Sequence, residues 1–184
     1  MSNTAANVTQ GKPAVTGGIW RAPIGTAAPT DATTALNAAF KCLGYISEDG
    51  VTNSNSPESD NIKAWGGDTV LTVQTSKEDT FGFTLIEASN LDVLKAVHGA
   101  ENVTGALATG VTVEANADEP EDAVWVIEMI LRGGVLKRIV IPDGKISEVG
   151  EVTYKDDEPV GYEVTVTAMP DASGNTHYEY IQQP

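Results

Sequence analysis

Hydrophobic and polar positions alternate most clearly in the stretch from Asp68 to Gly99. Apolar residues occupy every second position from Leu71 to Val73 and again from Phe81 to Leu85. A period of two is typical of a strand with one buried face. The polar run from Ser76 to Asp79 separates the two segments. We therefore expect a β-hairpin that turns in this run and has one core face and one polar, nearly uncharged face.

The pattern changes to that of a helix directly after this hairpin. Apolar residues recur at helical spacing within about residues 90–98. Ser89 or Asn90 can cap the start of the helix, and Gly99 can adopt the left-handed conformation that ends it. A helix of two to three turns is marginally stable by itself, so we expect it to pack on a sheet.

The C-terminal part of the chain reads as a series of strands. Gly133-Gly134 is a two-residue hairpin signal, and Asp143-Gly144 predicts a further turn. The run 124–132 has apolar residues on both of its faces, so we expect it to be covered on both sides. The predicted strands are 111–114, 124–132, 135–141, 145–154, 160–168 and 177–181. Short strands with one inserted helix indicate a mainly β fold, a β-sandwich or β-barrel with one packed α-helix.

The N-terminal third has a weaker pattern. Thr30 or Asp31 can cap a short amphipathic helix that places four apolar residues on one face: Leu36, Ala39, Phe40 and Leu43. The polar run 52–60 predicts a long loop. We expect three parts: a flexible N-terminal arm at 1–18, an extended arm with the short helix and long loop at 19–60, and a single β-sandwich or β-barrel domain at 61–184.

The charge balance limits the possible partners. Lys and Arg total 11 and Asp and Glu total 26, which gives a formal net charge of −15 at pH 7. Such acidity argues against stable binding to nucleic acid or to an anionic membrane surface. Cys42 is the single cysteine, so no intrachain disulfide can form. The N-terminus lacks a signal-peptide pattern, and no apolar run approaches the roughly 18 residues of a membrane span. We expect a soluble protein that does not use the secretion pathway.

Residues capable of catalysis or metal binding form no recognisable pattern. His98 and His177 lie far apart in sequence, and Cys42 has apolar neighbours. The chain contains no GxSxG turn and no glycine-rich phosphate loop. The acidic runs 118–122 and 156–158 lack the alternating oxygen ligands of an EF-hand, so we interpret them as solvated turns. We therefore expect no enzymatic activity, no cofactor and no metal site.

Two long segments carry a family resemblance. Gly17 to Val51, which contains LGYISEDG, and Ile141 to Ile181, which contains PDGK followed by EVGEVTYKDDE, resemble the major tail tube proteins of long-tailed, non-contractile bacteriophages. The resemblance covers most of the chain beyond the first dozen or so residues. It implies a β-sandwich or β-barrel subunit with a flanking helix, similar to the type VI secretion tube protein. It also implies a structural virion protein without cofactor or catalysis.

The resemblance further implies how the subunit acts. Subunits would close into hexameric rings, and the rings would stack into a tube through which the genome is ejected. The partners would be further copies of the chain together with the tape measure, tail tip and tail terminator proteins. DNA would pass through the lumen without stable binding, and no membrane is involved. The protein would be made in the host cytoplasm and reside in the virion tail.

Two sets of residues are candidates for these surfaces. The polar face of the predicted hairpin and of strand 160–168 is our hypothesis for the lumen wall, with an ordinary solvent-facing outer surface as the alternative: Thr72, Gln74, Thr84, Glu163, Thr165 and Thr167. The proline-broken apolar arm and the long loop are candidates for contacts between subunits or rings: Ile19, Trp20, Pro23, Ile24, Glu48, Asp49 and Asn53.

Two other functions fit the same fold class. A tube subunit of a contractile or secretion-type machine shares the fold but needs an outer surface shaped for a sheath. A non-enzymatic tail-associated binding module would use Trp65, Trp125 or exposed tyrosines as stacking platforms. That module requires aromatic residues on an open face, whereas Trp125 alternates with core positions. The resemblance favours the non-contractile tail tube.

Overall fold

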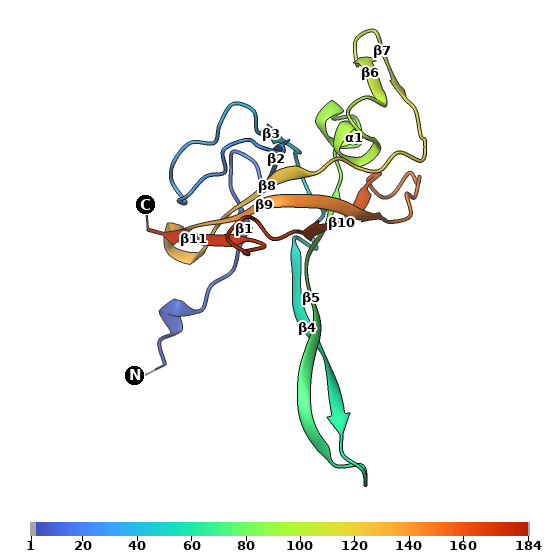
Figure 1. Ribbon diagram of the computed structural model, residues 1–184. Coiled ribbons are helices and arrows are strands. Elements are labelled where there is room, and N and C mark those ends of the chain that lie inside the picture. Colours follow the sequence, from blue (N-terminus) through green and yellow to red (C-terminus); the bar gives the residue numbers. More distant parts are fainter. Residues whose placement is uncertain (1–2, 184) are drawn as a thin grey trace.

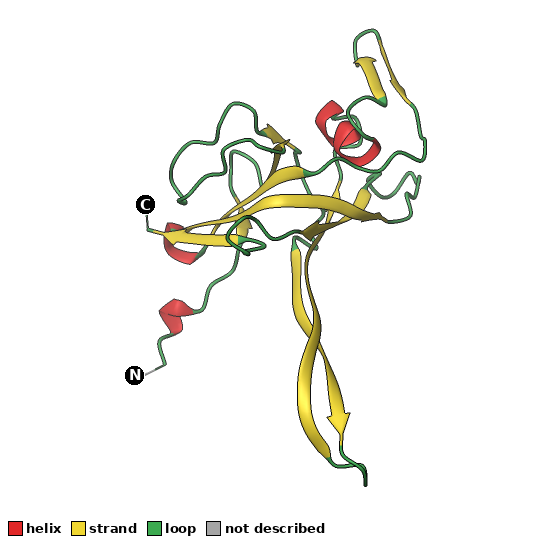
Figure 2. Cartoon of the chain, in the orientation of Figure 1, coloured by secondary structure: helices red, strands yellow, loops and turns green. Residues whose placement is uncertain are grey.

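The computed structural model describes residues 3–183, and strands dominate it (Figures 1 and 2). The helical elements are η1 (Ala5–Asn7), α1 (Leu91–His98) and η2 (Arg132–Gly134). The strands are β1 (Lys12–Pro13), β2 (Ile19–Pro23), β3 (Lys41–Cys42), β4 (Thr52–Lys63), β5 (Thr69–Leu85), β6 (Val103–Ala106), β7 (Gly110–Val113), β8 (Ala123–Ile130), β9 (Leu136–Val149), β10 (Tyr162–Ala168) and β11 (Tyr178–Gln182). The prediction of a mainly β fold with a packed helix is confirmed.

Nine strands form one antiparallel sheet. Its order is β3-β2-β8-β9-β10-β5-β4, while β1 pairs with β8 and β11 pairs with β9. The remaining two strands, β6 and β7, form a separate hairpin beside α1 (Figure 1). Strand β2, from the N-terminal part of the chain, therefore lies inside the sheet next to β8, although about a hundred residues separate the two strands in sequence.

Strand β8 is covered on both faces, as its sequence predicts. Trp125 and Ile127 belong to the main hydrophobic core on one face. Val124 and Val126 belong to a second, smaller cluster on the other face. Strand β9 pairs with β8 beyond a turn that contains Gly133, whose φ of 80° is readily adopted by glycine. The predicted β8–β9 hairpin is confirmed.

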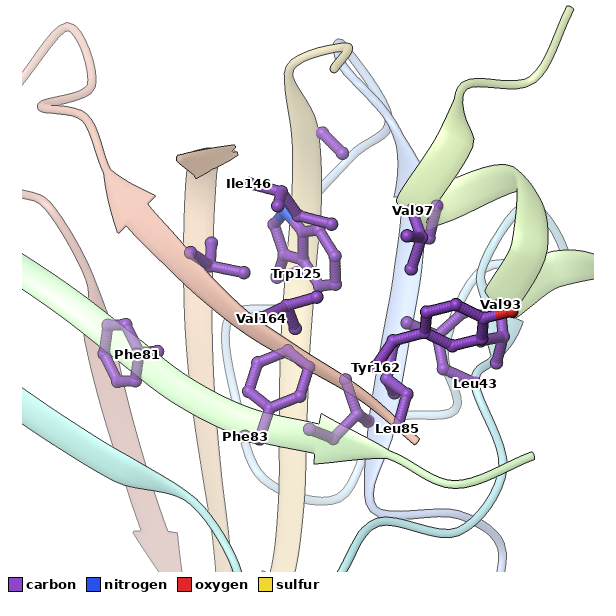
Figure 3. Close-up of a cluster of buried hydrophobic side chains, with 14 of the residues drawn as sticks. Leu43, Phe81, Phe83, Leu85, Val93, Val97, Trp125, Ile146, Tyr162 and Val164 are labelled. Atoms are coloured by element: carbon purple, nitrogen blue, oxygen red, sulfur yellow. The ribbon is translucent and has the colours of Figure 1, made fainter. Parts of the chain in front are cut away.

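The main core lies between the sheet and α1. Figure 3 shows apolar side chains from β5, β8, β10 and α1 gathered together. On β5 the buried apolar residues are Phe81, Phe83 and Leu85, and on β10 buried residues alternate with exposed or half-buried neighbours from Tyr162 to Ala168. The alternation predicted from Phe81 to Leu85 is confirmed, because this part of β5 and the whole of β10 each have one face on this core. The core face predicted for Leu71 and Val73 is wrong, because these side chains are 54% and 40% exposed on the part of β5 that projects beyond the core.

Helix α1 has the predicted ends. The Asn90 side chain accepts a hydrogen bond from the Asp92 backbone N–H at 3.0 Å, which satisfies one of the free donors of the first turn. Asp92 places a carboxylate at the positive end of the helix dipole. Gly99 ends the helix with a φ of 95°. Val93 and Val97 are buried against the sheet, which supplies the stability that a helix this short lacks alone.

The predicted turn at Ser76–Asp79 is wrong. These residues lie inside β5, a single strand of 17 residues that pairs along most of its length with β4. The turn between the two strands contains Gly66 and Gly67, with φ values of 117° and 98°. The segment Ser76–Asp79 is polar because most of this part of the strand faces solvent. Polar residues of this kind are also typical of turns, which is why the sequence pattern predicted a turn here.

The long loop predicted for residues 52–60 is also wrong, because this run is most of strand β4. All 12 residues of β4 are exposed. A two-stranded ribbon that projects into solvent has no buried face along most of its length, so its sequence shows no apolar alternation. Polarity alone therefore could not distinguish this strand from a loop.

The helix predicted after Thr30 or Asp31 does not form, and the segment is an irregular loop. The Asp31 carboxylate accepts hydrogen bonds from the backbone N–H groups of Thr33 and Thr34, both at 2.6 Å, so the capping contacts exist without a helix after them. Phe40 packs in the smaller cluster and Leu43 in the main core. An extended chain reaches both clusters, whereas a helix would place these residues on one face.

The turn predicted at Asp143-Gly144 is wrong, since β9 runs through it. The Trp125 indole Nε1 donates a hydrogen bond to the Gly144 carbonyl at 3.0 Å. A Cβ atom at position 144 would lie 2.9 Å from Trp125 Cδ1. Gly144 thus serves the close approach of an aromatic ring within the sheet rather than a change of chain direction.

Candidate assembly and lumen surfaces

The hairpin of β4 and β5 projects from the body of the subunit (Figure 1). Its far part pairs only within the hairpin and carries several exposed apolar side chains. Their exposed fractions are 51% for Ile62, 62% for Val70, 54% for Leu71 and 40% for Val73. Several exposed apolar side chains thus lie together on an element that projects away from the main core.

Trp65 stands at the tip of this hairpin and is fully exposed. The Ala64 N–H donates to the Asp68 carbonyl at 2.8 Å, which closes the turn. A Cβ atom at Gly66 or Gly67 would meet no other atom within 4 Å. The indole therefore extends from a slender tip whose immediate neighbours have little or no side chain.

A buried carboxylate anchors the base of the hairpin. Asp79 on β5 is 1% exposed and accepts hydrogen bonds from Asn53 Nδ2 at 2.8 Å, Thr176 Oγ1 at 2.5 Å and His177 Nδ1 at 2.5 Å. Burial acts to raise the pKa of Asp79, but these hydrogen bonds together outweigh burial and hold the pKa below its usual value. The cluster ties both hairpin strands to the segment that leads into β11.

Four of the six predicted lumen residues share one face of the body. On β10, Glu163, Thr165 and Thr167 alternate with buried valines, and Glu163 pairs with Thr84 of β5. The Thr167 hydroxyl donates to Ser147 Oγ at 2.8 Å. This face lies opposite the main core, and we call Thr84, Glu163, Thr165 and Thr167 the polar face.

A cation beside the polar face is already paired. Lys145 lies opposite Thr167 in the β9–β10 register, and its ammonium contacts Glu119 at 2.6 Å. The neighbouring carboxylate raises the pKa of Lys145 through this hydrogen bond. The charge of Lys145 is thus balanced within the subunit.

Thr72 and Gln74 lie elsewhere, on the projecting part of β5. Both are exposed, and the Thr72 hydroxyl donates to Asn61 Oδ1 at 2.7 Å across the hairpin. The structure therefore does not bring these two residues together with the polar face on the body. Their separation follows from the corrected hairpin, because the sequence pattern placed them on a short hairpin within the domain.

The predicted contact arm is strand β2 of the main sheet. Ile19 is 0% exposed in the main core, and Trp20 is half-buried, with its Nε1 donating to the Gly17 carbonyl at 3.3 Å. Pro23 and Ile24 remain exposed at the end of the strand, with Ile24 at 52%. Ile19 thus contributes to the core of its own subunit, while Pro23 and Ile24 are accessible.

The remaining predicted contact residues lie around the base of the hairpin. Glu48 and Asp49 are exposed in the turn that precedes β4, where the Ser47 hydroxyl donates to Asp49 Oδ2 at 3.2 Å. Asn53 is the donor to Asp79 described above, and it also donates to the Thr80 carbonyl at 3.1 Å. All three residues of this group are exposed, and the two that precede β4 are acidic.

A groove lies on the sheet beneath the loop of residues 31–40, which we call the strap. The cavity has a volume of about 570 Å³. Its lining includes apolar side chains from the strap, from β2 and from the β8–β9 hairpin: Trp20, Ala32, Leu36, Phe40, Met129 and Leu136. Leu36 is only half-buried within the subunit.

Arg138 holds the strap in place. It is 4% exposed, its guanidinium pairs with the Glu128 carboxylate, and its Nη1 donates to the carbonyls of Asp31 at 2.7 Å and Thr34 at 2.9 Å. The two carbonyls and the carboxylate together satisfy a charge that would be costly to bury alone. The sequence offered no signal for this contact, because its members are about a hundred residues apart.

Residues 4–184 match the family model described as phage tail tube protein. This chain belongs to the phage tail tube protein family. No curated protein matches its sequence. The match confirms that the resemblance is to phage tail tube proteins, of no particular tail type, and it supports a structural role in the virion tail.

Within residues 3–183, no group of three or more His, Cys, Asp or Glu side chains is arranged to hold a metal ion. The described helices of this tail tube protein are also too short or too polar to cross a membrane. The features that sequence reasoning missed are the projecting hairpin and the strap groove. The Gly66-Gly67 pair after Trp65 was the available signal for the true hairpin tip.

Proposed function

We propose that this tail tube protein self-assembles into stacked hexameric rings, which form the tail tube of a long-tailed, non-contractile phage. The projecting part of the β4–β5 hairpin carries the proposal, because its exposed apolar side chains lie beyond Asp79, where neither strand contributes a residue to the subunit's own core. Family membership supports a tube-forming role. The tube would serve as the conduit for genome ejection.

Other exposed positions would complete the contacts between subunits. Pro23 and Ile24 at the end of β2, and Glu48 and Asp49 before β4, are accessible and lie outside the core. Unpaired strand edges also favour assembly, since β4 ends the sheet with backbone donors and acceptors that only one neighbour satisfies. The proposed partners are further copies of this chain and the tape measure, tail tip and tail terminator proteins.

The polar face would line the lumen. It offers hydroxyl groups and a carboxylate, and the nearby Lys145 is paired with Glu119. Each free Lys or Arg that contacts a phosphate adds affinity by releasing counterions. A wall without free cations, in a chain with a net charge of −15, would let DNA slide through instead of holding it.

Electron microscopy of the purified full chain tests the proposal. Negative-stain images across a range of protein and salt concentrations should show rings or hollow tubes. Their number should rise with salt, because added ions screen the repulsion between acidic subunits. Globular monomers under every condition, including after a tail-tip complex is added as initiator, would contradict self-assembly.

A further inference from the structure

We propose that Trp65 of one subunit inserts into the strap groove of a second copy. This inference rests on the proposed self-assembly and adds a specific pair of contact sites to it. The occupant is the hairpin tip, residues 64–67, and the receiving site is the cavity between the strap and the β8–β9 hairpin.

The chemistry of the two sites matches. Trp65 is fully exposed, and a tryptophan side chain can bury roughly 150–250 Å² when it is covered. The strap groove holds about 570 Å³, with Trp20, Leu36 and Met129 among its apolar lining. An indole ring would cover these half-buried side chains and would itself leave water.

The shape of the tip favours insertion. Ala64, Gly66 and Gly67 surround the indole with little side-chain bulk. Both glycines have positive φ values and open space around them. A narrow tip of this kind can enter a cavity that a broader turn would only cover.

The geometry makes the contact intermolecular. From Asp79 at the anchored base to Thr69 beside the turn, β5 extends over roughly 30 Å at about 3.3 Å per residue. In Figure 1 the hairpin points downward, whereas the strap, the blue loop that leads to β3, lies above the main sheet. The tip therefore cannot reach the groove of its own subunit while the Asp79 contacts hold the base.

A contact between two different surfaces of the same chain is heterologous. After two subunits have paired, one of them still has a free hairpin tip and the other a free groove. Further subunits can therefore add through the same contact until a ring closes or an open polymer grows. This is the type of contact that a tube requires. A self-complementary interface would instead stop at a dimer.

The cations of the groove lining are already paired within the subunit. Lys137 contacts the Glu179 carboxylate at 2.8 Å, and Arg138 pairs with Glu128. The proposed contact therefore depends on the burial of apolar surface and not on attraction between opposite charges.

The contact is small by itself. One inserted tryptophan buries far less than the roughly 1,200 Å² of a stable pairwise interface. Isolated pairs of subunits are therefore not expected to persist, and the contact should form together with the other contacts of the polymer.

Cysteine cross-linking tests the pairing directly. In a Cys42→Ser background, one chain carries Ala64→Cys, which keeps Trp65 intact, and a second chain carries Ala35→Cys in the exposed part of the groove lining. The two chains are mixed under assembly conditions and oxidised. Disulfide-linked dimers should be at least tenfold more abundant than in a control mixture in which the second chain carries the exposed Ala172→Cys.

Two further variants test the contact without cross-linking. Trp65→Ala and the groove-filling Ala35→Trp should each raise the protein concentration needed for tube formation at least tenfold. The control Tyr154→Ala, which removes another exposed aromatic side chain, should change it less than twofold. Circular dichroism would verify that every variant is folded.

The outcomes separate this inference from the proposed function. Tubes that form normally from wild-type chain, with equal cross-linking in both mixtures and no effect of Trp65→Ala, would overturn the groove assignment and leave self-assembly intact. A wild-type chain that forms no rings or tubes in the microscopy experiment would overturn both.

Discussion

Asp79 shows how one residue can determine the position of a whole element. Its carboxylate is buried and accepts hydrogen bonds from Asn53 on β4 and from Thr176 and His177 before β11. Phe81 packs edge-on against the His177 ring, with ring centroids 5.3 Å apart. Because a carboxylate only accepts hydrogen bonds, His177 Nδ1 must carry a proton in this contact. The cluster thereby joins the hairpin to the C-terminal part of the sheet.

Replacing Asp79 should destabilise the subunit in a pH-dependent way. The pKa of Asp79 is lowered in the folded chain, so its contribution is fully present above the unfolded pKa of about 3.9 and is lost as pH falls through the lower folded pKa. At pH 7, Asp79→Asn should lower the free energy of unfolding by about 2–4 kcal/mol, because it removes charge-assisted hydrogen bonds in a buried site.

Urea unfolding of Asp79→Asn and wild type between pH 7 and pH 3 measures this effect. The difference between the two proteins should shrink below about pH 4. The matched control is Asp157→Asn, which changes an exposed carboxylate and should alter the free energy of unfolding by less than about 0.5 kcal/mol. A difference that stays constant down to pH 3 would show that the Asp79 charge does not matter.

At the scale of elements, the β4–β5 hairpin divides into two parts. Near the body, Phe81, Phe83 and Leu85 complete the main core and β5 pairs with β10. Beyond Asp79 the strands pair only with each other, and both are largely exposed. The far part therefore contributes little to the stability of the subunit, and its apolar side chains are available to other chains.

Shortening this hairpin should separate folding from assembly. Pro57 and Lys77 are paired across the hairpin, so residues 58–76 can be replaced by an Asn-Gly turn. The shortened chain should keep its cooperative thermal unfolding, with Tm within a few degrees of wild type, because the deleted segment lies outside the core. It should form no tubes in negative-stain images. Normal tubes from the shortened chain would exclude the hairpin as an assembly element.

At the scale of the whole molecule, the two sides of the sheet around β5 and β10 differ in character. One side carries the main core and α1, and the other carries the polar face. The strongly acidic chain keeps Lys145 paired beside that face. This asymmetry supports the proposal that the polar face lines the lumen, because an acidic chain with its nearby cation paired offers little attraction to a polyanion.

Cations introduced on the polar face should convert it into a DNA-binding surface. Assembled tubes of the double variant Thr84→Lys and Thr165→Lys should retain linear DNA that wild-type tubes release. The retention should weaken steeply with salt, since each phosphate contact contributes a slope of about −0.7 to −0.9 in log K against log salt. DNA retention by sedimented tubes at several salt concentrations measures the effect.

The control for the lumen assignment is Thr112→Lys, which places a cation on the exposed β7 strand of the separate hairpin beside α1. DNA fragments that enter only from the tube ends distinguish the two positions. Equal retention by the control and by the double variant would identify the polar face as an outer surface.

Local periodicity explains which elements could be predicted from the sequence. Helix α1 and β10 each have one face on a core, so burial imposes the period of the element on the sequence. Strand β8 is buried on both faces, and its hairpin with β9 was predictable from its apolar run and the Gly133-Gly134 turn. The strap and the β4–β5 hairpin lack this constraint. The strap is held by Arg138 from a distant strand, and the far hairpin strands have solvent on both sides.

The sequence by itself therefore determined the mainly β class, the capped helix, the acidity and, through its resemblance, the tail tube family. The tertiary structure alone revealed the projecting hairpin with Trp65 at its tip, the Asp79 cluster at its base and the strap groove. These features join segments that are distant in the chain, or they expose residues that local patterns assign to a core or a loop. Burial of one face makes apolar residues recur in the sequence with the period of the element. Contacts between distant segments and solvent exposure on both faces produce no such pattern.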